Sequence, residues 1–386
     1  MNKLNAMLIL MMCTLILAAC WDQIEIEERA FIFGMAIDAA DKTEVKLTQQ
    51  LVVPKNMATV AANAGGGAGK AYRNLSSTGK TIYEINLDLA KQASRSIDST
   101  HLGVILFSED IMKQPGRFKE HFDIFFREKR MRRGIKLAIT NGLAEDLLYV
   151  EAEHEKIPAE YIKNLLENKK RLDVTDLVRI GDIDEKLYEE TSFPLPYLKK
   201  ISSTVIDYEG IAIYNGKEER MVGVLKGDDA KALSYIRGLK NNGSINTEID
   251  GGPMTIEILT IKRKITLTNN DPNNLQFSIK IQIKGAIADQ SGWENLKEYE
   301  VLNKFYKKTS EKIEEMVKNT INKLQNDFQT DAMGLGEYLN RYYPKIWKEV
   351  QDEWDNGKNY FSKSDIDCEV KIVIEEPGSI NKTTSK

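Results

Sequence analysis

The chain has 386 residues, of which 42% are hydrophobic and 29% are charged, and its formal net charge is -4. This composition is typical of a globular protein of two or three domains. It excludes the basic face on which nucleic-acid binding depends, so no nucleic-acid partner is expected. The three cysteines and three scattered histidines offer neither a disulfide framework nor the spacing of a metal site.

Residues 1–19 have the pattern of a secretory signal peptide. Lys3 supplies a positive charge, and a mostly apolar run over residues 4–17 follows it. A membrane-spanning helix needs about 20 apolar residues, so this run is too short to be one. The run ends in Leu17-Ala18-Ala19-Cys20, which resembles the lipobox of bacterial lipoproteins. That resemblance implies cleavage before Cys20 and a diacylglycerol on its thiol; the alternative is a plain signal peptide that contains a cysteine.

Lipidation of Cys20 would make residues 20–30 a tether and would anchor the body to a bilayer without spanning it. Each buried CH₂ of an acyl chain is worth about 0.8 kcal/mol, so two or more chains hold firmly. Removal of residues 1–19 shifts the net charge from -4 to -5, because one Lys and no acid leave. Cys13 leaves as well, and Cys368 then remains as the last free thiol in a body without disulfides.

Strands and helices alternate over residues 31–167, which predicts an α/β or α+β fold, and we assign residues 31–200 to one N-terminal region or two subdomains. The apolar run 31–38 and the alternating run 45–53 indicate a β-hairpin. The Gly-rich stretch 65–69 lacks the spacing of a phosphate-binding loop. We interpret residues 58–80 as an exposed mobile loop.

Helix signals follow this loop. Thr78 or Thr81 is placed to cap a helix, and Ser108 is placed to cap another whose first turn is acidic. An aromatic stripe at helical spacing predicts core packing in place of a ligand site; it consists of Phe118, Phe122, Phe125 and Phe126. The basic cluster 127–133 either contacts anionic lipid headgroups or is a solvated helix end, and we prefer the second interpretation.

Residues 168–200 end in Phe193-Pro194-Leu195-Pro196, and we interpret them as a linker. Residues 201–376 are predicted to form a C-terminal α+β domain with antiparallel strands and two long helices, the second broken at Pro344. Asn215-Gly216 between two apolar runs indicates a hairpin. A shift of the apolar phase between Ile258 and Ile261 indicates a bulge. Cys368 lies on the apolar side of the last strand, and residues 377–386 are expected to be disordered.

No catalytic motif stands out in the sequence. There is no Gly-x-Ser-x-Gly elbow, no His-Glu-x-x-His and no cysteine pair to hold a metal. We therefore predict no catalytic, cofactor-binding or metal-binding residue. A pair of carboxylates about 5 to 9 Å apart, as a glycosidase needs, stays open as an alternative.

Three separated patches together resemble one family. The first is Cys20-Trp21-Asp22 followed by Ile24-Glu25-Ile26-Glu27-Glu28 and then by Phe33-Gly34-Met35-Ala36-Ile37-Asp38. The second is Tyr208-Glu209-Gly210-Ile211-Ala212-Ile213-Tyr214 with Val222-Gly223-Val224-Leu225. The third is Asp331-Ala332-Met333-Gly334-Leu335-Gly336, with Tyr343-Pro344-Lys345-Ile346-Trp347 and Trp354. In their order and spacing they resemble the C subunit of spore germinant receptors, the Ger(x)C family of lipoproteins from endospore-forming bacteria.

The resemblance implies a lipoprotein at the outer face of the inner spore membrane. It would work beside two membrane-embedded partners, the A and B subunits, when nutrients trigger germination. It implies no catalytic activity and no cofactor, and it carries one functional residue over, the lipidated Cys20. Two alternatives remain: a lipoprotein that itself captures a small nutrient, and an enzyme that acts on cell-wall material. By their position Trp347 and Trp354 favour packing over binding.

Overall fold

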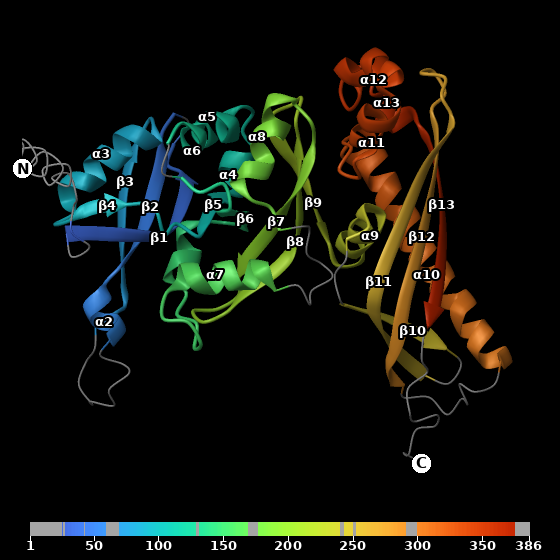
Figure 1. Cartoon of the computed structure of the whole chain (residues 1–386), viewed down its shortest axis with the longest axis horizontal. Helices are drawn as coiled ribbons and strands as arrows, with labels where there is room; N and C mark the ends of the chain where they lie inside the picture. The colour runs from blue at the N-terminus through green and yellow to red at the C-terminus, as the bar shows by residue number, and fades with distance from the viewer. Residues whose placement is uncertain are drawn as a thin grey trace, which may run out of the picture.

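The computed structural model describes residues 25, 28–41, 43–58, 69–128, 131–168, 177–239, 243–249, 252–290 and 299–374. The predicted signal peptide, Cys20, most of the Gly-rich stretch and the tail 377–386 lie outside these residues. In the described part the strands form one sheet of nine strands and one of four, and helices pack against both (Figure 1). This arrangement confirms the predicted mixed α+β class.

The first sheet is built from the N-terminal strands. They are β1 (Arg29–Ala39), β2 (Val45–Val52), β3 (Tyr72–Gly79), β4 (Ser96–Asp98), β5 (Val104–Ser108), β6 (Lys136–Asn141), β7 (Phe193–Lys200), β8 (Ile206–Asn215) and β9 (Arg220–Lys226). Their order is β3-β2-β1-β5-β6-β7-β8-β9, with β4 beside the start of β1. Strands β1, β5, β6 and β7 are parallel, and the strands on both outer sides are antiparallel. The predicted β1–β2 hairpin and the predicted β8–β9 hairpin are both confirmed. The loop predicted over residues 58–80 is wrong in its later part, because β3 pairs with β2 along its whole length.

Helices cover both faces of this sheet. They are α2 (Pro54–Ala58), α3 (Ile82–Gln92), α4 (Glu109–Met112), α5 (Arg117–Phe122), α6 (Ile124–Arg127), α7 (Pro158–Glu167), α8 (Ile180–Tyr188) and a 3₁₀ helix (Glu145–Tyr149). One core contains side chains from α3, α5, α6 and α8, and a second core on the opposite face contains those from α7. The first sheet is therefore buried on both sides, as its apolar parallel strands require.

The predicted helix caps differ in their outcome. Thr81 caps α3, since its Oγ1 accepts the backbone N–H of Glu84 at 3.1 Å. Ser108 occupies the N-cap position of α4, but its buried hydroxyl has no hydrogen-bond partner among the described residues, so the predicted side-chain cap is wrong. The aromatic stripe is core as predicted, although it is divided between α5 and α6.

The predicted linker over residues 168–200 is wrong. Its described part holds α8 and β7, and β7 lies inside the sheet between β6 and β8. Pro194 and Pro196 pair with β8 alone, because the pairing of β7 with β6 begins at Tyr197. A strand tolerates proline where one side carries no ladder hydrogen bonds. Since β7 pairs with β8, the first sheet also crosses the boundary that we predicted between residues 200 and 201.

The second sheet has the order β10-β11-β12-β13. Its strands are β10 (Gly243–Ile249), β11 (Gly252–Asn269), β12 (Gln276–Gln290) and β13 (Asp365–Ile374). The first three are antiparallel, with the predicted bulge between Ile258 and Thr260. Strand β13 is parallel to β12, so the prediction of antiparallel strands alone is incomplete. The helical connection between β12 and β13 provides the long crossover that a parallel pair needs.

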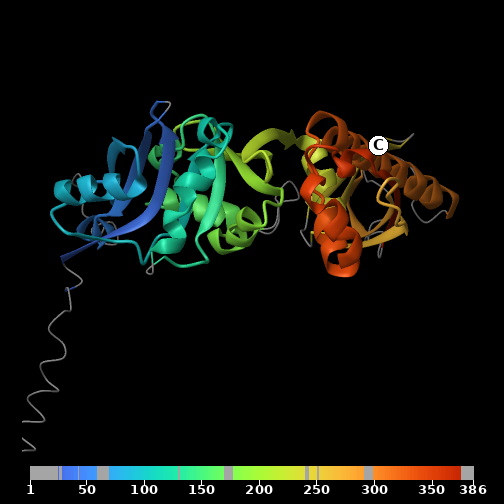
Figure 2. The same cartoon turned by 90° about the horizontal axis from the view of Figure 1, so that it is seen from above.

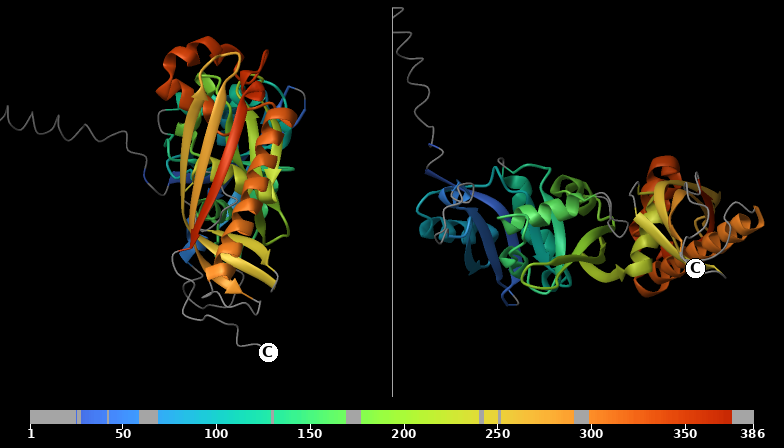
Figure 3. Two further views of the ribbon diagram at one scale, coloured as in Figure 1. Left: turned by 90° about the vertical axis from the view of Figure 1, so that its right-hand side faces the viewer. Right: turned by 90° about the horizontal axis from the view of Figure 1, so that it is seen from below.

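Helices also pack against the second sheet, and together with it they form the second half of the molecule, from α9 to β13. They are α9 (Gly227–Arg237), α10 (Tyr299–Asn322) with a π-helical end (Lys323–Asp327), α11 (Leu335–Tyr342), α12 (Pro344–Val350), a 3₁₀ helix (Gln351–Glu353) and α13 (Tyr360–Lys363). Helix α10 runs beside β13 (Figure 3). Pro344 breaks the second predicted helix into α11 and α12, as its sequence indicates. No helix in the described ranges is both long and apolar enough to cross a membrane.

The hydrophobic core of the second half extends onto strand β8 of the first sheet. On β8, Ile211 and Ile213 belong to the core of the second half, whereas Ala212 and Tyr214 belong to the core of the first. Alternate residues of a strand point to opposite faces, so β8 contributes to both cores. The halves therefore lie side by side as packed neighbours (Figure 2).

Candidate functional site at the junction of the two sheets

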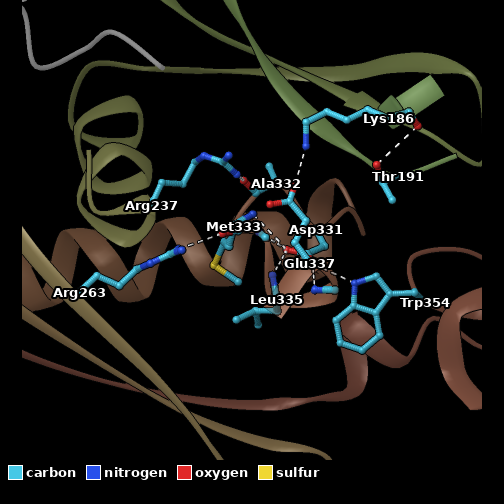
Figure 4. A network of polar contacts seen from close by, with 12 residues as sticks. Lys186, Thr191, Arg237, Arg263, Asp331, Ala332, Met333, Leu335, Glu337 and Trp354 are labelled. Atoms are coloured by element: carbon cyan, nitrogen blue, oxygen red, sulfur yellow. Dashed lines mark hydrogen bonds and ion pairs between the residues drawn. The ribbon is translucent and has the colours of Figure 1, made fainter. Parts of the chain in front are cut away.

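Asp331 organises the loop that leads into α11. It is 5% exposed, and its carboxylate accepts hydrogen bonds of 2.7–3.2 Å (Figure 4). The donors are the backbone N–H groups of Met333, Gly334, Leu335 and Gly336 and the indole N–H of Trp354. The first N–H groups of a helix lack partners within the helix and attract negative charge. Asp331 therefore fixes the start of α11 and attaches Trp354 to it.

Gly336 lies directly beneath two tryptophans. A Cβ atom at this position would stand 2.9 Å from Cη2 of Trp347 and 2.9 Å from Nε1 of Trp354. The two indoles meet edge to face, with ring centroids 5.8 Å apart. The absence of a side chain at Gly336 thus permits this packing. Trp354 is 4% exposed, which agrees with our expectation that it packs against its neighbours and does not bind a ligand.

Polar contacts connect this loop to the first sheet. The hydroxyl of Ser192, just before β7, donates to Oδ2 of Asp355 and accepts the N–H of Gly216 at 3.0 Å. Asn215 donates through Nδ2 to Oγ1 of Thr330 at 2.8 Å and to the carbonyl oxygen of Asp355 at 3.3 Å. The Asn215-Gly216 turn therefore joins two strands of the first sheet, and Asn215 also forms hydrogen bonds to the second half.

Charged groups flank these contacts. Lys186 of α8 forms an ion pair with Glu337 of α11. Arg237 donates to the carbonyl oxygen of Ala332 at 2.8 Å. Burial alone would raise the pKa of Glu337, but Lys186 and the nearby arginines outweigh burial and hold that pKa below its usual range. Glu337 therefore stays ionised and keeps its attraction to the first half.

Asp355 has the opposite electrostatic environment. The pKa of this carboxyl is raised to about 6; burial is the largest cause, and the nearby charge of Asp331 acts in the same direction. The hydroxyl of Ser192 and the backbone N–H of Asp331 oppose this rise by donating to the carboxylate. The contact between the halves thus includes a group that titrates in the mildly acidic range.

A cavity of about 300 Å³ lies between the halves at this point. Residues of both halves line it, among them Glu190, Ser192 and Lys217 from the first and Trp347 and Asp352 from the second. The cell-wall enzyme alternative needs one protonated carboxyl and one free carboxylate across a cleft. Asp331 is committed to its N–H donors, so the Asp331–Asp355 pair does not meet that requirement.

Residues of the third family-like patch gather here, among them Asp331, Gly336 and Trp354, whereas the other residues that the sequence singled out lie elsewhere. Cys20 lies outside the described residues. Within the described ranges no group of three His, Cys, Asp or Glu side chains is arranged to hold a metal ion. Arg127 pairs with Asp123 on the surface, in agreement with a solvated helix end. Cys368 is buried, and burial raises the pKa of its thiol to about 12, which keeps the thiol unreactive.

The role of Asp331 was missed at the level of the sequence. The signal was an Asp three residues before a Gly-x-Gly-type start of an apolar helix, which is a position for capping the helix from outside. Its indole partner lies 23 residues further along the chain, and its connection to Ser192 runs through Asp355. Spacing alone does not indicate such contacts.

Comparisons with known proteins agree with this two-part construction. A family model described as a spore germination protein N-terminal domain matches residues 22–200, and one described as spore germination B3/GerAC like, C-terminal, matches residues 209–378. Spore germination protein YndF of Bacillus subtilis (strain 168) is 27% identical over 98% of each chain. Spore germination protein B3 of the same organism is 27% identical and covers 95% of this chain and 96% of its own. The crystal structure of the GerBC protein has the same fold, with a TM-score of 0.59 at 22% identity over 89% of this chain and 97% of that one.

Proposed function

The chain belongs to the GerAC-like family of spore germination proteins, and on this premise we propose that it is the lipid-anchored C subunit of a nutrient germinant receptor. The observation that carries the proposal is the match of both family models, one after the other, along nearly the whole chain after Cys20. In this role the protein contacts the membrane-embedded A and B subunits and supports their response to nutrients. It works at the outer face of the inner spore membrane.

The proposed anchor is an acylated Cys20. The lipobox-like Leu17-Ala18-Ala19-Cys20 at the end of the apolar run supports it. Strand β1 begins at Arg29, so its start lies nine positions after the anchor in the sequence. An extended chain reaches at most about 3.5 Å per residue, so the start of β1 stays within about 30 Å of the lipid. The first sheet would therefore face the membrane partners.

The proposed role is one of binding and not of catalysis. The buried carboxylate of Asp331 at the junction of the sheets accepts hydrogen bonds that hold the fold together. The rigid contact between the halves suits a subunit that presents a fixed surface to its partners.

The anchor has a direct test with a matched control. Cys20→Ala should abolish labelling with a radioactive fatty acid such as palmitate, shift the protein out of the membrane fraction and slow germination. Cys13→Ala, which changes a cysteine seven residues upstream, should leave label, location and germination unchanged. Membrane retention of the Cys20→Ala protein without label would refute the proposed anchor. If spores that carry a soluble Cys20→Ala protein germinate normally, the lipid anchor is not needed for germination.

A further inference from the structure

A cleft of about 710 Å³ lies on the first sheet, away from the junction. Its floor is the β1–β2 pair, where Met35 and Gln49 stand directly opposite each other in the ladder. Opposed residues of neighbouring strands present their side chains on one face. The walls come from α3 on one side and from the α5–α6 segment on the other (Figure 1). The cleft is thus a gap in the helical layer that covers this face.

Apolar atoms form most of the exposed surface of this lining, although fewer than half of the lining side chains are themselves apolar. Ile82 of α3 and Phe125 of α6 are buried at its base. Leu87 is about half exposed and extends the apolar wall outward. Binding sites for small molecules are concave, mainly apolar and of about 300–1,000 Å³. In size and lining the cleft is of this type.

Two buried polar atoms of the lining have no partner. They are Oε1 of Gln49 and Nε2 of His121, in residues that are 1% and 3% exposed. Neither atom has a hydrogen-bond partner among the described residues. Gln49 uses its Nε2 to donate to Oδ1 of Asn86 at 2.6 Å, so its oxygen remains available to a donor. A buried polar atom without a partner is unfavourable, so a ligand group that donates to it gains binding energy.

Charged side chains of both signs line the rim of the cleft. Asp123 is paired with Arg127, and Glu120 is paired with Arg117 at 3.6 Å. Lys80 and Arg95 also line the cleft, and no ion pair to either is found within the described ranges. Glu128 adds a further carboxylate to the lining. Lys80 and Arg95 are therefore two positive groups without an ion-pair partner in the described ranges, and each can attract an anionic group.

We propose that this cleft binds a small carboxylate with an apolar body. The carboxylate meets Lys80 and Arg95 at the rim, and the apolar body packs against Ile82 and Phe125. A hydrogen-bond donor next to the carboxylate reaches Oε1 of Gln49. The inference goes beyond the proposed function, because it depends neither on the lipid anchor nor on the membrane subunits.

The binding is tested with three probes of the same shape. Equilibrium dialysis of the full mature chain in mild detergent measures isocaproate, its neutral amide, and leucine, which adds an ammonium donor to isocaproate. We expect saturable binding of one isocaproate per chain, about tenfold tighter than that of the amide, because a hydrogen bond to a charged group is lost in the amide. Leucine should bind more tightly than isocaproate. Absence of saturable binding by both carboxylates, or equal binding of acid and amide, would overturn the proposal, and weaker binding of leucine would overturn the role of Gln49.

Two variants test whether the carboxylate binds in this cleft. Arg95→Gln should weaken isocaproate binding about tenfold, whereas Lys91→Gln, a change on α3 outside the lining, should not affect it. Lys91 pairs with Asp88 and is exposed. Ala90→Trp fills the cleft from an exposed position, so it should abolish binding while the circular dichroism spectrum and melting curve stay those of the wild type. Unchanged binding by Arg95→Gln and Ala90→Trp would show that the carboxylate binds elsewhere and would refute the site.

Discussion

Replacement of Asp331 by Asn tests the organisation of the junction most sharply. The change keeps shape and size but removes the charge and turns one oxygen into a donor. If the remaining oxygen keeps the N–H groups of Met333, Gly334 and Leu335, the new NH₂ group faces the N–H of Gly336 and the indole N–H of Trp354. Two buried donors then lose their acceptor, at about 1–3 kcal/mol each. The free energy of unfolding should fall by about 2–6 kcal/mol.

Urea unfolding followed by tryptophan fluorescence measures this loss. Trp354 lies in the network and Trp347 beside it, so the signal reports on the junction. Asp327→Asn is the matched control, because Asp327 is exposed at the end of the π-helical segment. It should change the free energy of unfolding by less than about 0.5 kcal/mol. If Asp331→Asn unfolds at the same urea concentration as Asp327→Asn, the carboxylate does not organise this loop.

The remaining predictions concern the close contacts and the pH dependence of the junction. Gly336→Ala should destabilise the protein by about 1–3 kcal/mol, because its Cβ would overlap the tryptophans; Gly134→Ala, with nothing within 4 Å, should not, and equal melting temperatures would contradict this. Gly223→Ala places a Cβ 2.4 Å from Cε1 of Phe328 and should destabilise the packing of the halves, and Phe328→Ala in the same chain should restore part of that loss. Additive effects in that double variant would rule out the contact. Asp355 has a folded pKa of about 6 against a reference of 3.8, so it contributes stability below about pH 4 that is lost as pH rises through 6, about 3 kcal/mol in all. Asp355→Asn should flatten urea unfolding midpoints between pH 4 and 7, and an unchanged slope would refute the assignment.

Local patterns predicted the elements whose structure depends on their own residues. The alternation of apolar residues predicted the β1–β2 hairpin and the bulge in β11, because one buried face fixes the register. The capping of α3 by Thr81 likewise depends on a residue three positions away. In these cases the contacts that determine the structure join residues that are close to one another in the sequence.

The predictions that were wrong or missing concern features that depend on residues far away in the sequence. Pro194 and Pro196 indicate a break in an isolated segment, yet β7 tolerates them because β6 pairs with it only beyond them. The parallel direction of β13 depends on the connection through α10 and not on the pattern of the strand. Gly223 and Gly336 were visible as family marks, but the aromatic rings above them are known only from the fold. The same holds for the contact of Ser192 with Asp355.

A stable complex with two membrane subunits is the core of the proposed role, and affinity purification from detergent-solubilised spore membranes tests it most directly. The tagged full chain should be recovered with two membrane-spanning proteins in equal amounts, identified by mass spectrometry. The Cys20→Ala chain should be depleted from the same membranes, and the Cys13→Ala chain should be recovered normally. Recovery of the lipidated chain alone, from membranes in which both subunits are present and soluble in the detergent, would contradict the proposed role.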